Sequence, residues 1–151
     1  MYMTLSRETS AGYLSNWAAR LFTRAIERRL ATTGIATAYL PILFALADGG
    51  ALTQKILARR AAVEQPTMAA TLKRMERDGF VRRQPDPADR RSALVSLTPL
   101  AEQQLAHVEA SVEQINEMAM AALDPAERKA LLWQLLQVIA ALEDDEANAS
   151  S

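Results

Sequence analysis

The spacing of hydrophobic residues predicts a mainly helical protein. Across residues 7–33, apolar side chains recur at steps of three and four, which indicates one long amphipathic helix. Gly34 suits a left-handed stop after that helix. A second helix is expected over residues 37–46, with Thr37 as its N-cap and Pro41 in its first turn, where a missing N–H costs little.

Two shorter helices follow at a spacing typical of a helix-turn-helix. Thr53 is well placed to cap a helix over residues 54–61, and residues 62–64 form the turn. In the next helix, one narrow stripe should be buried, formed by Met68, Leu72, Met75 and the capping Gly79. The rest of that helix offers small residues and cations, namely Gln65, Pro66, Thr67, Ala69, Ala70, Lys73, Arg74 and Arg77.

Two strand-like runs and a cationic loop come next. Residues 80–84 and 93–97 are expected to be strands, and Arg90 and Arg91 lie between them. Because the two prolines of this loop remove backbone donors, we expect a projecting hairpin tip and not a continued ladder. Asp89 is expected to hold the guanidinium of Arg91 in one orientation, as suits an arginine that enters the minor groove of A/T-rich DNA.

Each of these features alone also fits an ordinary protein surface. Helices with three basic residues are common, and a local Asp–Arg pair in a loop contributes about 0 to 1 kcal/mol. Their succession is more informative, because one helix of a pair fits the major groove while a basic hairpin reaches an adjacent groove. The pattern therefore predicts a winged helix-turn-helix.

The C-terminal third is expected to form two long helices. Thr98-Pro99 starts the first of them with a cap and a first-turn proline, and residues 124–127 start the second in the same way. Apolar residues from Leu105 to Ala122 alternate at steps of three and four, which is typical of a heptad seam that needs a partner helix.

These terminal helices exceed what the core of a winged helix needs. We therefore expect residues 37–98 to form a DNA-binding lobe, and residues 7–34 with 99–143 to form a helical dimerisation region. A monomeric helical core is the alternative. The acidic residues 144–151 are expected to form a disordered tail.

Charge is distributed unevenly along the chain. The net charge is −1, but residues 52–99 carry ten cations and five anions, whereas residues 100–151 carry two cations and ten anions. Such asymmetry is typical of a polyanion-binding segment on a separate scaffold. Chance clustering on solvated helix faces is the alternative.

Composition argues against several other classes of protein. The 151 residues amount to one domain, and half are hydrophobic, so general disorder is excluded. With no cysteine and a single histidine, His107, we expect no disulfide, metal or cofactor site. No residues have catalytic spacing, so an enzyme is not expected. Neither a signal peptide nor a membrane span is evident, so the expected location is the cytoplasm.

The order of elements resembles the MarR family of bacterial winged-helix transcription regulators, over nearly all of residues 1–151. The resemblance is carried by Leu52-Thr53-Gln54, Leu57-Ala58, Pro66-Thr67-Met68, residues 74–81, and residues 85–92 leading into 94–98, which are similar to the family's wing signature. Three residues depart from the family pattern. Ala61-Ala62 stand where a larger apolar residue and a glycine are usual, and Glu64 stands where serine is frequent.

The resemblance implies a homodimeric, sequence-specific regulator of transcription, most simply a repressor. Its two recognition helices would enter successive major grooves of a palindromic, A/T-rich operator. The residues facing the groove would be Gln65, Thr67, Ala69, Lys73 and Arg74. Asp89 would be the orienting carboxylate, and Arg91 the side chain inserted into the minor groove.

The resemblance also implies release from DNA by a small ligand, often aromatic or phenolic. The side chains that would line its cleft are Tyr13, Trp17, Tyr39 and Phe44, although aromatic residues at helical spacing are more often core. A function of a different class remains open: the winged lobe would dock an acidic protein partner instead of DNA.

Overall fold

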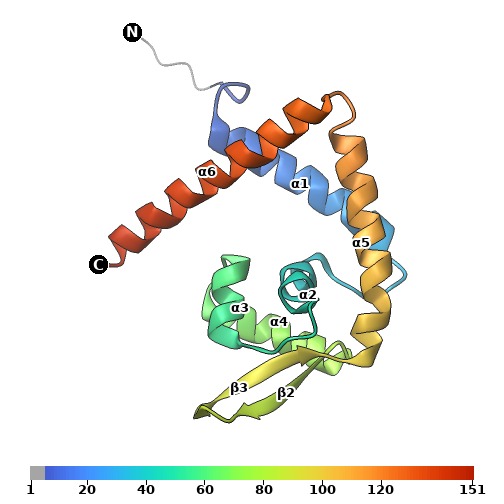
Figure 1. The fold of residues 1–151 in the computed structure, drawn as a ribbon, viewed down its shortest axis with the longest axis vertical. Coiled ribbons are helices and arrows are strands. Elements are labelled where there is room, and N and C mark those ends of the chain that lie inside the picture. Colours follow the sequence, from blue (N-terminus) through green and yellow to red (C-terminus); the bar gives the residue numbers. More distant parts are fainter. Residues whose placement is uncertain (1–5) are drawn as a thin grey trace. The chain divides into compact units, whose positions relative to one another are not determined.

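The computed structural model describes residues 6–151 and has the predicted order of elements (Figure 1). The elements are α1 (Ala11–Leu30), the short 3-10 helix η1 (Thr37–Tyr39), α2 (Leu40–Leu46), β1 (Leu52–Thr53), α3 (Gln54–Ala61), α4 (Gln65–Arg77), β2 (Val81–Asp86), β3 (Asp89–Leu97), α5 (Pro99–Ala119) and α6 (Pro125–Ala149). The predicted fold class, mainly helical with a small β-hairpin wing, is confirmed. The chain divides into two compact units, the first ending at Glu113 and the second spanning Gln114–Ser151.

The core of the first unit lies among α2, α3, α4 and the sheet. The sheet is antiparallel with the order β1-β3-β2, so β3 is its central strand. The side chains that are almost fully buried include Ile42, Leu46, Leu57, Met68, Leu72, Met75 and Val95. Burial of each such side chain contributes about 1.5–3 kcal/mol, so this apolar cluster fixes how the two short helices meet the sheet.

The helix-turn-helix forms as its sequence predicts. The hydroxyl of Thr53 caps α3 by accepting a hydrogen bond from the backbone N–H of Ile56 at 3.3 Å. Met68, Leu72 and Met75 are buried as predicted, and Thr71 is buried with them, whereas Gly79 is half-buried and follows the end of α4. The Thr71 hydroxyl donates to the carbonyl of Thr67 at 3.0 Å, which satisfies a polar group that would otherwise be costly to bury.

Helices α3 and α4 end in the same hydrogen-bonding pattern. At the end of α3, the N–H of Val63 donates to the carbonyl of Ala58 at 3.1 Å, and that of Ala62 to Arg59 at 3.2 Å. This pair of bonds is a Schellman motif, which places one residue in the left-handed conformation. That residue is Gly79 in α4, with φ +82, but Ala62 in α3, with φ +54.

Two helix starts differ from the predictions. Helix α1 starts at Ala11, not near residue 7, because the hydroxyl of Ser10 caps it by accepting from the N–H of Tyr13 at 3.1 Å. Thr37 does not cap the second helix and lies within η1. The N–H of Tyr39 donates to the carbonyl of Ala36 at 2.9 Å, so a tight 3-10 turn satisfies a donor that a side-chain cap would otherwise have to meet.

The hairpin ladder extends further than its prolines predicted. Strand β2 continues through Pro85, which pairs with Ala93, and the loop is reduced to Pro87 and Ala88. Because β2 is an edge strand, a missing N–H at Pro85 does not have to break the ladder. The irregularity appears instead as a register shift between Pro85 and Asp86.

In the second unit, α6 begins with the predicted capping box. The carboxylate of Asp124 accepts from the N–H of Glu127 at 2.9 Å, and that of Glu127 accepts from the N–H of Asp124 at 2.8 Å. The helix continues to Ala149, whereas residues 144–151 were expected to be a disordered tail. Alanine and glutamate are strong helix formers, which favours continuation even though acidic residues suit a C-terminal turn poorly.

Candidate nucleic-acid interface

Helix α4 presents the predicted small and cationic face to solvent. Gln65, Pro66, Thr67, Ala70, Lys73, Arg74 and Arg77 are exposed, and Ala69 is half-buried. The guanidinium of Arg74 donates to the hydroxyl of Thr71 at 3.4 Å, and that of Arg77 pairs with Asp78 at 3.0 Å. Among the described residues Lys73 has no ion pair, so its ammonium is available to a phosphate.

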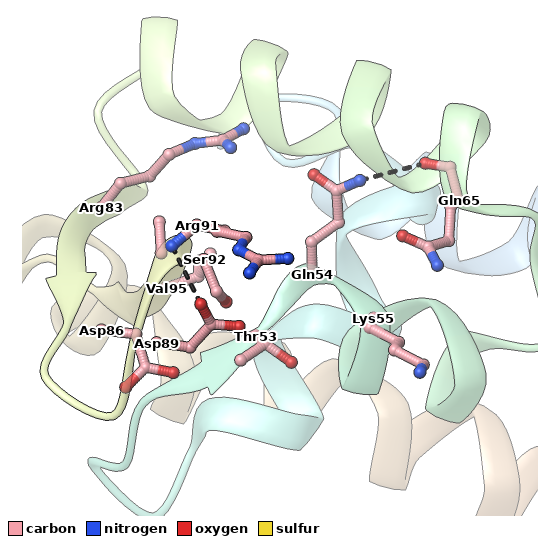
Figure 2. Close-up of a pocket in the computed structure, with 11 residues that line it drawn as sticks. Thr53, Gln54, Lys55, Gln65, Arg83, Asp86, Asp89, Arg91, Ser92 and Val95 are labelled. Carbon is pink, nitrogen blue, oxygen red and sulfur yellow. Dashed lines mark hydrogen bonds between the residues drawn. The ribbon is translucent and has the colours of Figure 1, made fainter.

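The alternation of β3 decides which arginines of the wing face the helices. Val95 is buried, so Arg91, four residues earlier, lies on the same inner face of the hairpin. Arg83 pairs with Val95 in the ladder and shares that face. Arg90 therefore lies on the outer face. Figure 2 shows the guanidinium of Arg91 between the wing and the start of α3.

A groove of about 540 Å³ lies between the inner face of the wing and the starts of α3 and α4. Its lining residues are Thr53, Gln54, Lys55, Gln65, Arg83, Asp86, Asp89, Arg91, Ser92, Ala93 and Val95 (Figure 2). The side-chain amide of Gln54 donates to the carbonyl of Gln65 at 3.5 Å and so links the two helices. The groove brings together Gln65, Asp89 and Arg91, which are three of the residues expected to bind DNA.

Several residues of this groove were not predicted. Gln54 and Lys55 belong to the first turn of α3, which folds next to the wing only in three dimensions. Arg83 lies two residues after buried Val81 on β2, and this spacing could have placed it on the inner face. The remaining predicted contacts lie outside the groove, either along the exposed face of α4 or, for Arg90, beside a second hollow of about 410 Å³ at the wing.

Asp89 acts on the backbone of the wing, not on the guanidinium as predicted. Its carboxylate accepts a hydrogen bond from the N–H of Arg91 at 3.0 Å, and no ion pair joins the two side chains among residues 6–151. The short aspartate side chain reaches its own backbone two residues on more easily than it reaches the end of an arginine. Asp86 makes the equivalent bond to the N–H of Ala88 at 2.9 Å. The two carboxylates together brace the hairpin turn.

A polar network connects the end of α4 to η1. The buried Tyr39 hydroxyl donates to Asp78 at 2.8 Å, and Asp78 also pairs with Arg77. The hydrogen bond from Arg77 lowers the pKa of the Asp78 carboxyl, and the bond from Tyr39 lowers it further. Burial raises the pKa of the Tyr39 phenol, and its bond to Asp78 adds to that shift. The pairing raises the pKa of Arg77, which therefore stays charged.

The four aromatic residues predicted to line a ligand cleft lie in three different environments. Tyr13 and Trp17 pack edge to face on α1, with ring centroids 6.5 Å apart, and the guanidinium of Arg7 lies 3.5 Å from the Trp17 centroid. Tyr39 is 3% exposed and packs against Phe80, so it belongs to the core. Phe44 is 52% exposed on α2.

The described part of the chain contains neither a metal-binding cluster nor a membrane-spanning helix. Between residues 6 and 151, no three histidine, aspartate or glutamate side chains are grouped so that they could hold a metal ion. No helix in the same range has both the length and the apolar character needed to cross a bilayer.

Fold and site together define a winged helix-turn-helix protein with a basic recognition helix and a basic wing. Residues 33–92 match the family model described as MarR family. The HTH-type transcriptional repressor NicR of Pseudomonas putida is 30% identical over 138 residues, which are 91% of this chain and 85% of NicR. The chain belongs to the MarR family of DNA-binding transcriptional regulators.

Two solved structures extend this comparison. Bordetella bronchiseptica BpsR, whose DNA binding is regulated by 6-hydroxynicotinic acid, is 28% identical, with a TM-score of 0.75 over 84% of this chain and 96% of its own. Reduced AbfR bound to DNA is 25% identical, with a TM-score of 0.68 over 86% of this chain and 89% of its own.

Proposed function

We propose that the protein is a homodimeric repressor that binds a palindromic, A/T-rich operator and is released by a small aromatic ligand. The observation that carries this proposal is the groove that brings Arg91, on the inner face of the wing, next to Gln65 at the start of α4, the helix whose exposed face carries Lys73, Arg74 and Arg77. A helix fits the major groove, and an arginine on an adjacent hairpin suits the narrow minor groove.

The apolar surface of the terminal helices supports a dimer. Large apolar side chains are exposed along α6, namely Leu131, Leu132, Trp133, Leu135, Leu136, Val138, Ile139 and Leu142. At about 100 degrees per residue, these residues without Trp133 cover about 160 degrees of the helix, which is wider than the seam for one partner helix. On α1, Tyr13, Leu14, Leu21 and Phe22 are exposed as well. Monomeric proteins rarely expose a helix face as apolar as that of α6, so we propose that a second copy covers it.

A dimer gives the operator its symmetry. Two recognition helices related by a twofold axis would read half-sites about one helical turn, or 34–36 Å, apart. Gln65, Thr67, Ala69, Lys73 and Arg74 are the proposed contacts in each major groove, with Pro66, Ala70 and Arg77 beside them, and Arg90 and Arg91 are the proposed wing contacts. The cations would bind phosphates, and the polar and small residues would approach base edges.

The proposed effector is a small aromatic acid. BpsR has a fold similar to this chain, and its DNA binding responds to an aromatic acid. On this chain, Tyr13 and Trp17 offer exposed or half-exposed rings with the Arg7 guanidinium next to them, and Phe44 offers a further exposed ring. An aromatic carboxylate could stack on such rings and pair with the cation. Tyr39 belongs to the core and is not proposed as a direct contact.

Selection of bound fragments from a random duplex pool tests the proposal. We expect a palindrome with A/T-rich flanks, and Arg91→Ala should weaken its binding about tenfold. Repeating the selection with 6-hydroxynicotinic acid and benzoate should reduce recovery, and Trp17 fluorescence in a Trp133→Phe background should change as ligand binds. If no duplex is recovered at low salt while an acidic protein is retained, the lobe is a protein-docking module instead.

A further inference from the structure

One ion pair joins the recognition helix to the wing. The Nε of Arg83 on β2 lies 3.0 Å from a carboxylate oxygen of Glu76 on α4. The Arg83 side chain is 36% exposed and that of Glu76 is 51% exposed, so solvent screens the pair and it adds little to folding stability. Its position beside the groove suggests a different role.

Three cations line the groove, and they differ in whether a carboxylate pairs with them. Arg83, Arg91 and Lys55 all line it. Among the described ion pairs, Arg83 is engaged by Glu76, whereas Arg91 and Lys55 are in none. Figure 2 shows the Arg83 side chain directed toward α4, whereas the guanidinium of Arg91 lies near the start of α3. One of the three positive charges is therefore neutralised before DNA arrives.

The groove on the protein lies where the sugar-phosphate strand between the major and minor grooves of DNA would pass. If α4 occupies a major groove and the wing reaches the adjacent minor groove, the sugar-phosphate strand between those grooves lies over the space that separates them. A free arginine there would bind phosphate on any sequence, because phosphate contacts carry no base information. Such a contact would raise nonspecific and specific affinity together.

We propose that Glu76 holds Arg83 away from the DNA backbone and so limits the part of the binding affinity that does not depend on DNA sequence. This inference rests on the proposed function. By neutralising Arg83, Glu76 limits the affinity of the lobe for arbitrary duplexes and leaves discrimination to the α4 face and Arg91. Glu76 acts through Arg83, so it is a positioning residue and does not itself contact DNA.

Salt dependence of binding measures the number of phosphates neutralised. The logarithm of the binding constant falls with the logarithm of salt concentration by about 0.9 for each phosphate contact. Fluorescence anisotropy of the full-length protein is measured on the selected operator and on a scrambled duplex of equal length and composition. The variants are Glu76→Gln, Arg83→Gln and the double variant, with Glu109→Gln on the exposed face of α5 as a charge-matched control.

In Glu76→Gln, the slope should steepen by about 0.9 per protomer on both duplexes. That slope corresponds to about fivefold tighter binding per protomer to scrambled DNA near physiological salt. Arg83→Gln should keep the wild-type slope, and the double variant should match Arg83→Gln. Glu109→Gln should resemble the wild type, which shows that the effect is not one of net charge alone.

Three results overturn the inference. A shallower slope in Arg83→Gln would mean that Arg83 already contacts phosphate in the wild type. An unchanged slope in Glu76→Gln would mean that the ion pair withholds nothing. A double variant that keeps the gain of Glu76→Gln would mean that Glu76 acts by its own charge on DNA. In each case the wild type still binds its operator, whereas a wild type that binds neither duplex refutes the proposed function itself.

Discussion

The C-terminal ends of α3 and α4 have the same motif, so opposite substitutions at the two ends can test the cost of backbone strain. Both end in a Schellman motif, but the left-handed position is glycine at Gly79 and alanine at Ala62. A left-handed conformation costs an L-residue about 1–2 kcal/mol. Replacing alanine by glycine there also raises the entropy of the unfolded chain, which offsets about 0.4–1 kcal/mol of the gain. We therefore expect Ala62→Gly to raise the free energy of unfolding by about 0.5–1 kcal/mol.

The reverse substitution should have the opposite effect. A Cβ added at Gly79 would meet the Cδ2 of Leu100 at 3.7 Å, which is an ordinary contact, so the loss is conformational and not steric. Gly79→Ala should lower the free energy of unfolding by about 0.5–1 kcal/mol. Ala70→Gly, at an exposed position inside α4, is the matched control and should also lower it by about 0.5–1 kcal/mol.

Urea denaturation followed by circular dichroism measures these differences at one fixed protein concentration, because association would otherwise contribute to stability. In thermal unfolding, a change of 1 kcal/mol in a chain of this size moves Tm by about 2–4 °C. An Ala62→Gly variant as unstable as Ala70→Gly would refute the reasoning, because glycine would then act at position 62 as it does inside a helix.

Further predictions concern the polar network and the wing. Tyr39→Phe should lower the free energy of unfolding by about 1 kcal/mol. Because burial raises the pKa of Tyr39, the wild type should lose this advantage as pH rises above about 10. Urea titrations of the phenylalanine variant should show no such loss. Because the pKa of Asp78 is lowered, its contribution is complete above about pH 4 and disappears in more acidic solution, so wild type and Asp78→Asn should converge there. Asp89→Ala should weaken operator binding in anisotropy titrations. Asp89→Asn should not, because it keeps an oxygen that accepts from the N–H of Arg91. Equal losses in the two variants would show that the carboxylate charge matters.

The sequence predicted most of the helices and strands because their local signals agree with their packing. The cap at Thr53, the buried stripe of α4 and the capping box of α6 each depend on residues within one turn of each other. Such contacts are encoded in spacing alone. The start of α1 after Ser10 was missed because the weaker cap signal of this residue lies inside the longer run that was expected to form the helix.

The details of the site depended on contacts that spacing does not encode. Whether Pro85 breaks a ladder depends on β2 being an edge strand, which only the sheet order reveals. Asp89 had two possible partners in Arg91, and it accepts a hydrogen bond from the nearer backbone N–H and not from the guanidinium. The Glu76–Arg83 pair joins a helix to a strand across a turn, so neither residue could be assigned a role from its own element.

The same limit applies to the aromatic residues. Tyr39 and Tyr13 have similar chemical character in the sequence, yet one is 3% exposed with its hydroxyl engaged and the other is 47% exposed. Burial decides which of them can meet a ligand, and burial follows from tertiary packing. The terminal helices are a further case, because their apolar periodicity predicts a partner but does not identify it.

The measurement that tests the account most directly is the stoichiometry and spacing dependence of operator binding. Sedimentation velocity of the purified protein is recorded with the selected duplex and with the same duplex carrying about five extra base pairs, or half a helical turn, between its half-sites. We expect two chains on each selected duplex and a loss of that complex when the half-sites are rotated apart. One chain per duplex, or equal binding to both duplexes, would contradict a dimer that places two basic lobes on one face of the DNA.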